Sequence, residues 1–256
     1  MPDAILRTHD LRKEYGALVA VSDVSIAIER NSLHSIIGPN GAGKTTLFNL
    51  LSGTVKPTSG SVVYKDEDIT NLPEYKAIHK GIGRSYQITN VFPNLTVFEN
   101  VRLAAQSLDG SNFRFMTSVA SFPDVNARTT EVLERVGLGG DALKLARALP
   151  HGDQRKLELG MILAPDPEVL LLDEPTAGMA SDQVPELMAL VTEIQSEENK
   201  TVVLVEHNMN VVMNASDRIT VMHQGSVLAE GTPDEIANNA TVQEAYLGHL
   251  YEEDGS

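Results

Sequence analysis

The sequence predicts an α/β fold with a mostly parallel sheet and an inserted helical lobe. In both halves of the 256-residue chain, short apolar runs bounded by turn residues alternate with segments of helical spacing, a pattern typical of parallel sheets covered by helices. From about Gln87 to Gln154 the pattern becomes helical. A chain of this length can bury a substantial core as one large domain or as a domain with a lobe.

The first half is expected to contain three strands and a helix. Val19–Ile28 alternates enough to predict a strand, and Ser32–Ile37 is a short apolar run that enters a glycine-rich loop. Thr45–Ser52 has helical spacing. Ser61–Tyr64 follows the turn at residues 56–60 and is predicted to be the third strand.

In the middle of the chain, Val97–Gln106 and Ala127–Val136 are the clearest helix candidates. Ser107–Pro123, between them, is irregular and rich in phenylalanine. We expect these aromatic side chains to form local core rather than a ligand surface. They are Phe113, Phe115 and Phe122.

The alternation of strand and helix returns after residue 163. The predicted elements are a strand at Val169–Leu172, a helix near Val184–Ser196, a strand at Thr201–Val205, a helix near Met209–Ala215, and a hairpin formed by Ile219–His223 and Val227–Glu230. Thr232–Glu235 has the form of a capping box with proline at the first helical position, so a C-terminal helix should begin there.

Composition excludes several classes of protein. Without cysteine the chain has neither a disulfide framework nor thiolate metal sites. Its apolar runs are far shorter than the roughly 20 residues that span a bilayer, and Asp3 and Arg7–Asp10 interrupt any secretory signal. A net charge of −15 argues against a general nucleic-acid binder, which normally has a basic face. We expect a cytoplasmic protein, free or attached to a membrane partner.

The acidic charge has two interpretations that the sequence leaves open. One is an ordinary, well-hydrated surface. The other is adaptation to a salt-rich cytoplasm, in which acidic side chains are screened. The second predicts a melting temperature that rises with KCl into the molar range, and a melting temperature insensitive to salt would exclude it.

A phosphate-binding loop is predicted between the strand at Ser32–Ile37 and the helix at Thr45–Ser52. Its sequence, GPNGAGKTT, fits the pattern GxxxxGK[ST] in the required strand–loop–helix context. Backbone N–H groups and the helix N-terminus would bind phosphates, Lys44 would reach the β- and γ-phosphates, and the Thr45 hydroxyl would bind Mg²⁺. The residues expected to contact the nucleotide are Gly38, Pro39, Asn40, Gly41, Ala42, Gly43, Lys44, Thr45 and Thr46.

Two carboxylates follow the apolar strand at Val169–Leu172. Asp173 ends a buried run, where an unpaired charge is costly, so we expect it to serve Mg²⁺. Glu174 points the other way, towards an attacking water, and is expected to act as general base or to position that water. A structural salt bridge is the alternative for this pair.

His207 follows the strand at Thr201–Val205. Polar side chains at the carboxyl ends of strands in open α/β sheets face a ligand crevice. We therefore expect His207 to bond the γ-phosphate and to orient Glu174 and the water, although a lone histidine is more often structural. The other histidines, including His34 and His79, are expected to be structural.

Together these residues resemble the ATP-binding cassette (ABC) ATPases, a branch of the P-loop NTPases, over nearly the whole chain. The resemblance implies an ABC ATPase fold with an N-terminal antiparallel β region and an inserted α-helical lobe. It also implies ATP and Mg²⁺ as cofactors. Tyr15, 23 residues before Gly38, matches an aromatic that stacks on adenine, with a plain surface tyrosine as the alternative. Gln87 matches a catalytic glutamine that contacts Mg²⁺ and links the lobe to the core. Lys44, Glu174 and His207 would be the other catalytic residues.

The run LPHGDQ at residues 149–154 falls on the family signature. In this family the signature reaches across a dimer to the other subunit's γ-phosphate. The resemblance therefore implies that His151, Gly152 and Asp153 bind nucleotide held by a second ABC ATPase subunit, in a homodimer or a heterodimer. Two sites would be formed, each from both chains.

Finer details resemble the ATPase subunits of branched-chain amino-acid importers. They are the runs HGDQRKLELG at 151–160, VEHNM at 205–209, and EGTPDEI at 230–236 leading to AYLG at 245–248. Related subunits that move urea, amides or lipopolysaccharide share much of this pattern.

Two positions depart from the family pattern. Pro150 stands where the signature usually has serine, so a hydroxyl contact to the neighbour's γ-phosphate is lost. The backbone N–H of Gly152 and the helix dipole remain available, and weaker closure rather than inactivity is expected. Ala177–Ala180 lacks an aspartate that many relatives carry, so communication between the two sites is expected to differ.

These resemblances imply the ATP-hydrolysing subunit of an ABC importer, peripheral to the cytoplasmic face of the cell membrane. Separate permease subunits would dock on the helical lobe near Ile88–Thr96, an extracytoplasmic solute-binding protein would act through them, and nucleic acid would not be a partner. Residues 1–86 and 156–230 would form the nucleotide-binding core, 87–155 the signature lobe and 231–256 a C-terminal helical extension, all within one ABC transporter domain.

Two other functions stay open. One is a non-transport ABC protein acting on DNA, chromosomes or ribosomes. Leu149 follows Gln87 by only 62 residues, without heptads, and there is a single cassette, which argues against it. The other is a regulatory subunit that binds ATP without transport, and co-purification with membrane subunits would separate it from an importer.

Overall fold

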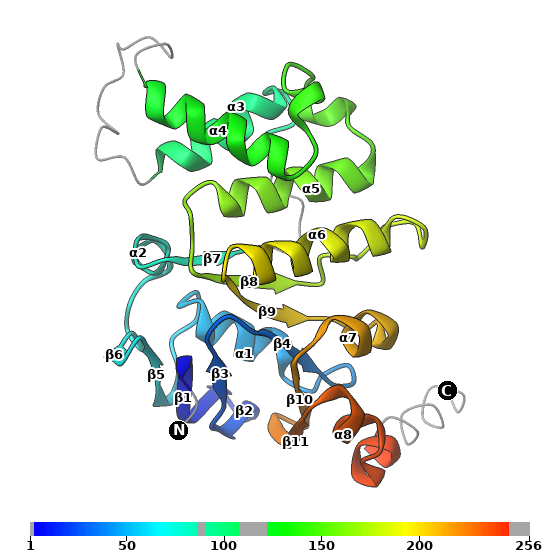
Figure 1. Cartoon of the computed structure of the whole chain (residues 1–256). Coiled ribbons are helices and arrows are strands. Elements are labelled where there is room, and N and C mark those ends of the chain that lie inside the picture. Colours follow the sequence, from blue (N-terminus) through cyan, green and yellow to red (C-terminus); the bar gives the residue numbers. More distant parts are fainter. Residues whose placement is uncertain (1–2, 86–90, 108–121, 246–256) are drawn as a thin grey trace.

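The protein has an antiparallel sheet at one end, a six-stranded sheet in the middle and a helical lobe at the other end (Figure 1). The computed structural model describes residues 3–85, 91–107 and 122–245. This arrangement confirms the predicted α/β fold, with its N-terminal antiparallel region and its inserted lobe.

The six-stranded sheet is parallel except for one edge strand. Its order is β11 (Ser226–Gly231), β10 (Arg218–His223), β4 (Leu33–Ile37), β9 (Thr201–Val205), β8 (Val169–Asp173) and β7 (Ile82–Arg84), and only β11 is antiparallel to its neighbour. The strands predicted at β4, β8 and β9 are confirmed, as is the hairpin of β10 and β11. Strand β7, which is only three residues long, was not predicted.

Strands β8 and β9 are buried on both faces, which explains their continuous apolar sequences. Leu171 and Val203 pack into the core on the side of the antiparallel sheet. Their neighbours Leu170 and Leu204 pack into the core beneath the helical lobe. Because adjacent strand residues point to opposite faces, these two strands join both cores and hold their carboxyl ends in a fixed position.

The antiparallel sheet consists of β1 (Ala4–Tyr15), β2 (Leu18–Val24), β3 (Ala27–Glu29), β5 (Ser59–Tyr64) and β6 (Glu67–Asp68). The single strand predicted at Val19–Ile28 is wrong: Asp23 adopts a positive φ of 51° and the chain forms β2 and β3. Strand β1 was not predicted either. Its buried Thr8 accepts a hydrogen bond from the Ile26 N–H and donates one to the Val24 carbonyl, so a polar side chain is satisfied inside the sheet.

The described helices are α1 (Lys44–Leu51), α2 (Glu74–His79), α3 (Val97–Gln106), α4 (Pro123–Arg135), α5 (His151–Leu163), α6 (Val184–Glu197), α7 (Met209–Ala215) and α8 (Pro233–Ala237). Helices α3 and α7 have the predicted bounds, and α2 was not predicted. A capping box between Thr232 and Glu235 opens α8, as the sequence predicts, and Thr96 and Glu99 form another at α3.

Helices α3, α4 and α5 form the lobe, which stacks on α6 of the core (Figure 1). Arg135 at the end of α4 joins lobe to core, because its guanidinium contacts three carboxylates near the end of α6: Glu193 at 2.8 Å, Glu198 at 2.9 Å and Glu197 at 3.2 Å. In the lobe, Phe122 is half-buried, whereas Phe113 and Phe115 lie outside the described residues. No described helix combines the length and apolarity needed to cross a membrane.

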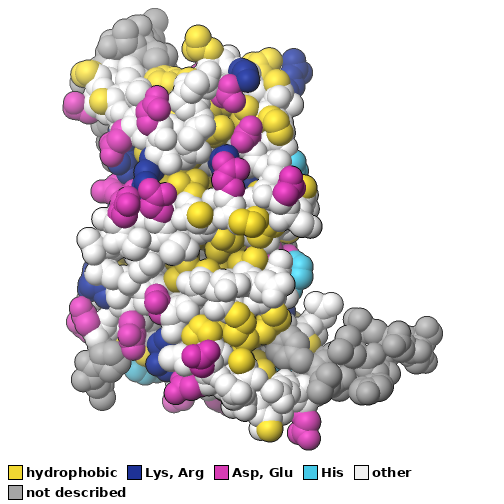
Figure 2. Space-filling view, turned by 45° about the vertical axis from the view of Figure 1, so that its right-hand side comes forward, with side chains coloured by type: hydrophobic (Ala, Val, Ile, Leu, Met, Phe, Trp, Pro, Cys, Tyr) yellow, Lys and Arg dark blue, Asp and Glu magenta, His cyan; other side chains and the backbone are white. Residues whose placement is uncertain are grey.

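Acidic side chains are spread over the face drawn in Figure 2, and the fewer basic side chains lie mostly beside them. Ion pairs also link basic and acidic side chains of the described residues, for example Lys156 and Glu186 at 2.6 Å. Among the described residues of this face, the negative charge is therefore distributed rather than concentrated in one patch.

Candidate active site

The glycine-rich loop connects the end of β4 to the start of α1, and close packing requires two of its glycines. A Cβ atom on Gly38 would lie 2.3 Å from the carbonyl oxygen of Met222, and one on Gly43 would lie 2.4 Å from that of Ala20. Gly43 also has a φ of 98°, which favours glycine. The loop is thus folded tightly against β10 and β2, with its N–H groups at the opening of a helix.

Lys44 is buried within this loop and is 9% exposed. Its ammonium donates hydrogen bonds to the carbonyl oxygens of Gly38 at 2.7 Å and Pro39 at 3.0 Å. Burial lowers the pKa of Lys44, while the nearby carboxylates of Glu174 and Asp173 act in the opposite direction. The first turn of α1 contains no acidic residue, so its positive end is available for an anionic ligand.

Asp173 lies at the end of β8 with only 4% of its surface exposed. Burial, then the neighbouring charge of Glu174, raises its pKa to about 6, although Arg84 and Lys44 oppose this. Its Oδ1 atom is buried and has no hydrogen-bond partner among the described residues. An oxygen ligand in this state fits a hard cation such as Mg²⁺, which is usually bound by one or two carboxylates together with waters and substrate phosphates.

Glu174 and His207 follow the neighbouring strands β8 and β9 and come together as predicted. The Nδ1 atom of His207 lies 3.8 Å from Oε1 of Glu174. Glu174 has a left-handed φ of 47°, and its N–H donates to the carbonyl of Val205 at 2.8 Å. The Glu174 carboxylate is one-third exposed and His207 is more exposed, so both are accessible to a ligand at this edge of the sheet.

Comparison with known proteins identifies what this geometry belongs to. A family model described as ABC transporter matches residues 21–177, and a model described as branched-chain amino acid ATP-binding cassette transporter matches residues 226–251. The chain is 40% identical to the high-affinity branched-chain amino acid transport ATP-binding protein LivG of Escherichia coli, with 97% of this chain and 99% of LivG covered. The chain belongs to the ABC transporter family.

Solved structures agree with this assignment. The ADP conformation of MJ1267, an ATP-binding cassette of an ABC transporter, matches with a TM-score of 0.85 and 28% identity, over 96% of this chain and 99% of that one. A dimeric post-hydrolysis state of the cassette MJ0796, bound to ADP and phosphate, matches with a TM-score of 0.75 and 28% identity, over 89% and 98%. This protein is therefore an ABC ATPase that binds nucleotide.

The remaining predicted nucleotide contacts are distributed over several elements of this ABC ATPase. In the loop, Gly38, Pro39 and Ala42 are buried, Thr46 is half-buried, and Asn40, Gly41 and Thr45 are exposed. Tyr15 ends β1 with 49% of its surface exposed, and the Lys13 ammonium lies 5.0 Å from its ring centroid. This ring is accessible for stacking, whereas Gln87 lies outside the described residues.

The segment that matches the ABC signature forms the N-terminus of α5. Helix α5 packs with Leu170 and Leu204 on one face of the sheet, whereas α1 packs with Leu171 and Val203 on the other. Pro150 occupies the N-cap position and makes no side-chain capping bond. A Cβ on Gly152 would lie 2.9 Å from Oε1 of Gln183, and one on Gly178 would lie 3.3 Å from Cε1 of His151. The signature therefore packs on the segment that follows Glu174, and His151 and Asp153 do not contact the P-loop in the hydrogen bonds or ion pairs of the described residues.

Four side chains in this region escaped the sequence analysis as candidate site residues. Ser85 accepts a hydrogen bond from the Asp173 N–H at 2.8 Å, and Arg84 bonds Asn49 and Ser52 near the end of α1. Glu206, fully buried, accepts hydrogen bonds from Thr176. The sequence offered one signal for these residues: Glu206 is a charged residue directly after the apolar run of β9.

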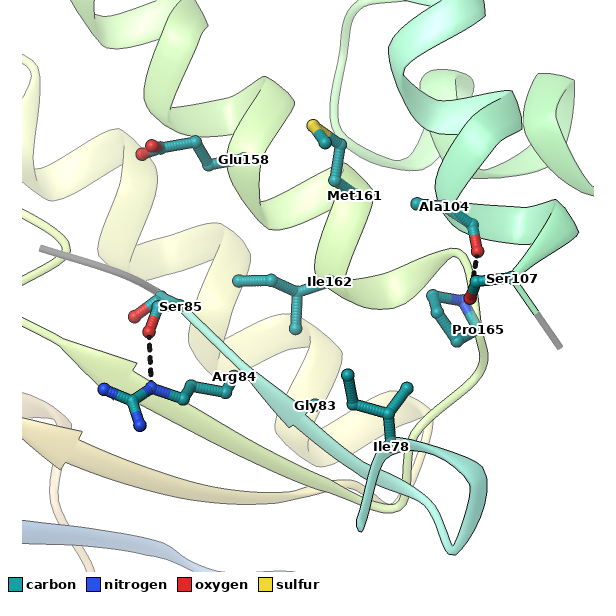
Figure 3. Close-up of a pocket in the computed structure, with 10 residues that line it drawn as sticks. All are labelled: Ile78, Gly83, Arg84, Ser85, Ala104, Ser107, Glu158, Met161, Ile162 and Pro165. Atoms are coloured by element: carbon teal, nitrogen blue, oxygen red, sulfur yellow. Dashed lines mark hydrogen bonds between the residues drawn. The ribbon is translucent and has the colours of Figure 1, made fainter. Parts of the chain in front are cut away.

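A small apolar pocket of about 190 Å³ lies between the core and the lobe (Figure 3). Ile78 and Gly83 line it from the core, and Met161 and Ile162 of α5 line it from the lobe. Arg84 and Ser85, which reach the nucleotide site through the bonds described above, also line this pocket. The pocket is therefore connected to both α1 and Asp173.

Proposed function

We propose that this ABC ATPase powers an importer of branched-chain amino acids, in which two cassettes close on ATP and hydrolyse it. The observation that carries the chemistry is the buried, unpartnered Oδ1 of Asp173 beside Glu174 and His207. The amino-acid substrate is supported by the likeness to LivG and by the branched-chain family model at residues 226–251.

Hydrolysis would proceed by in-line attack on the γ-phosphate. Glu174 holds the attacking water and accepts its proton, His207 bonds a γ-phosphate oxygen, and the bond to the bridging oxygen breaks so that ADP leaves with the electron pair. The P-loop N–H groups and Lys44 stabilise the negative charge. Bound Mg²⁺, which Thr45, Asp173 and Gln87 would hold, supplies further charge neutralisation on the phosphates.

Each site would be completed by the α5 N-terminus of a second cassette, identical or related. This is supported by the dimeric ADP- and phosphate-bound cassette that the chain resembles and by the exposed position of His151 at the start of α5. His151, Gly152 and Asp153 would contact the partner's nucleotide. Since Pro150 offers no hydroxyl, contact there depends on backbone N–H groups.

The permease subunits would dock at the pocket between lobe and core. Residues 91–96 of the expected docking segment Ile88–Thr96 lead into α3, whose Ala104 lines this pocket. An apolar side chain of a permease helix fits a lining of Ile78, Met161 and Ile162. The Ser85 hydroxyl accepts a hydrogen bond from the Asp173 N–H. A shift of Ser85 on docking would then move Asp173, and this would couple docking to the nucleotide site.

Docking can be tested with matched surface substitutions. Ile162→Glu should uncouple ATP hydrolysis from the permease while leaving hydrolysis by the isolated cassette unchanged, because a buried charge would oppose an apolar contact. Leu143→Glu is the control, since Leu143 is 87% exposed and does not line the pocket. If ATP hydrolysis is coupled to the permease equally well in Ile162→Glu and Leu143→Glu, the docking proposal is wrong.

The transport function needs the assembled system, including a solute-binding protein on the other side of the membrane. In proteoliposomes containing the cassette and its permeases, hydrolysis should be stimulated by binding protein loaded with leucine, isoleucine or valine. Stimulation by urea, an amide or lipopolysaccharide instead would assign another substrate. If the cassette copurifies with no membrane protein, a non-transport role is favoured.

A further inference from the structure

Glu206 is a fully buried glutamate immediately after β9. A buried carboxylate is costly unless hydrogen bonds satisfy it. Its Oε1 accepts from the Thr176 hydroxyl at 2.6 Å and the Thr176 N–H at 3.2 Å. Its Oε2 accepts from the N–H of His207 at 3.2 Å, and the Asn208 N–H lies 3.5 Å away. The donors satisfy the charge without an Arg or Lys partner among the described residues.

These donors come from two different loops. Thr176 lies two residues after Glu174, the proposed base, whereas His207 is the proposed γ-phosphate contact. Each oxygen of one carboxylate therefore holds one of the loops that carry the reacting groups. The Nδ1 atom of His207 lies 3.9 Å from Oε2 of Glu206 and 3.8 Å from Oε1 of Glu174. The imidazole is therefore about equally far from both carboxylates.

Electrostatics also connects Glu206 to the nucleotide site. The pKa of Asp173 is raised mainly by burial and then by Glu174, and the negative charge of Glu206 adds to this. Glu206 thus lies within electrostatic range of the proposed metal ligand, although it is too deeply buried to touch a nucleotide itself.

We propose that Glu206 is a positioning residue for ATP hydrolysis, bridging the loop after Glu174 to the loop of His207 and setting the separation of their side chains. The proposal rests on the roles assigned above to Glu174 and His207. Glutamine at this position presents an N–H₂ group to one set of N–H donors, so it keeps at most one half of the bridge. Small misplacement of reacting groups can lower a rate about a hundredfold.

The test is steady-state hydrolysis by the full chain carrying Glu206→Gln or Thr176→Val. Both should lower kcat by about 10- to 100-fold, the range for lost supporting hydrogen bonds, while KM for ATP changes by less than about twofold. Thr176→Ser, which keeps the hydroxyl, should restore kcat. The double variant should lose little more than either single one, because both break the same bridge.

Thr8→Val is the matched control, since Thr8 is also buried and also bridges two backbone segments, far along the chain from these loops. At an equal loss of melting temperature it should keep its kcat. The proposal is overturned if Glu206→Gln and Thr176→Val keep wild-type kcat, or if their activity falls only as far as that of Thr8→Val. If Glu206→Gln does not fold, Thr176→Val and Thr176→Ser decide the question.

Glu174→Gln and His207→Ala, measured in parallel, separate this proposal from the site assignment. If they abolish hydrolysis and the Glu206 and Thr176 variants keep wild-type kcat, positioning by Glu206 is wrong and the assignment stands. If Glu174→Gln and His207→Ala hydrolyse ATP normally, the assignment is wrong and the bridge has no reacting groups to position.

Discussion

In the proposed dimer, the N-terminus of α1 in one chain and the N-terminus of α5 in the other would contact the same nucleotide phosphates from opposite sides. At α1 the loop is buried, its glycines pack against the Met222 and Ala20 carbonyls, and Lys44 is held by two hydrogen bonds. At α5 the opening residue is Pro150, which makes no side-chain cap, and His151 is exposed. One of these N-termini is preformed within a single chain, and the other begins with an exposed residue.

This difference shows how the fold divides the work of one site. Strands β4, β8 and β9, buried on both faces, hold the P-loop, Asp173 and His207 at one edge. The α5 opening belongs to the lobe, which contacts the core through α6 and the ion pairs of Arg135. In the proposed function, the core therefore carries the chemistry and the lobe supplies the contact with a second chain.

The largest expected effect is in the core. Glu174→Gln should bind ATP but turn over at least about a hundredfold more slowly, because the general base is lost. Single-turnover hydrolysis together with nucleotide binding measures both properties. Near wild-type hydrolysis would show that another group takes the proton and would break the division between core and lobe.

Loop packing at α1 gives the next largest effect. Gly43→Ala should destabilise the protein by about 3 kcal/mol, because the new Cβ meets the Ala20 carbonyl and the positive φ is strained. Gly41→Ala is the control: it has a φ of 76° but nothing within 4 Å of the added Cβ, so about 1 kcal/mol is expected. Equal unfolding free energies in urea would contradict a tightly preformed loop.

The sequence predicts the core of this molecule well because both-sided burial gives a simple pattern. β8 and β9 appear as unbroken apolar runs, and α7 follows an Asn208 that caps it with two hydrogen bonds. β1 has no such pattern, since its register shifts at several places and it buries Thr8 among apolar residues. Its partners, which decide that it is a strand, lie elsewhere in the chain.

The same contrast applies to the site. The P-loop, Asp173, Glu174 and His207 belong to short local motifs, so the sequence alone selects them as candidates, and their roles stay predictions. Ser85 and Glu206 act through hydrogen bonds to residues 88 and 30 positions away, which only the folded sheet brings together. Their roles depend on the geometry of loops, and no local pattern encodes that geometry.

Asp173→Asn should stabilise the protein at neutral pH while abolishing hydrolysis. The pKa of Asp173 rises from 3.8 to about 6, so its stabilising effect is present below pH 4 and is lost as the pH rises through 6. A pKa change of one unit corresponds to about 1.4 kcal/mol of unfolding free energy. After the cost of burying the asparagine amide is subtracted, the variant should be more stable than the wild type by about 2 kcal/mol at pH 7.

Urea unfolding of both proteins without Mg²⁺ and nucleotide measures this effect, and their difference should shrink towards zero near pH 4. His34, fully buried with its pKa lowered to about 4, destabilises both proteins as the pH falls below 6.5, so its contribution cancels in that difference. An equally large difference at every pH would mean that packing, not charge, is responsible.

The smallest effect is expected at the N-terminus of α5. It tests whether a hydroxyl at position 150 would add a contact to the partner's nucleotide. Pro150→Ser should strengthen ATP-dependent dimerisation about fivefold, since one added hydrogen bond to a phosphate contributes about 1 kcal/mol. Dimer formation against ATP concentration, in a Glu174→Gln background that prevents turnover, measures it.

A serine N-cap also stabilises its own helix by about 1 kcal/mol, so the melting temperature of the monomer must be measured as well. Pro150→Ala removes the ring without adding a hydroxyl and should leave dimerisation unchanged. An unchanged ATP dependence in Pro150→Ser, with a raised monomer melting temperature, would mean that the hydroxyl caps α5 and never reaches the partner's nucleotide.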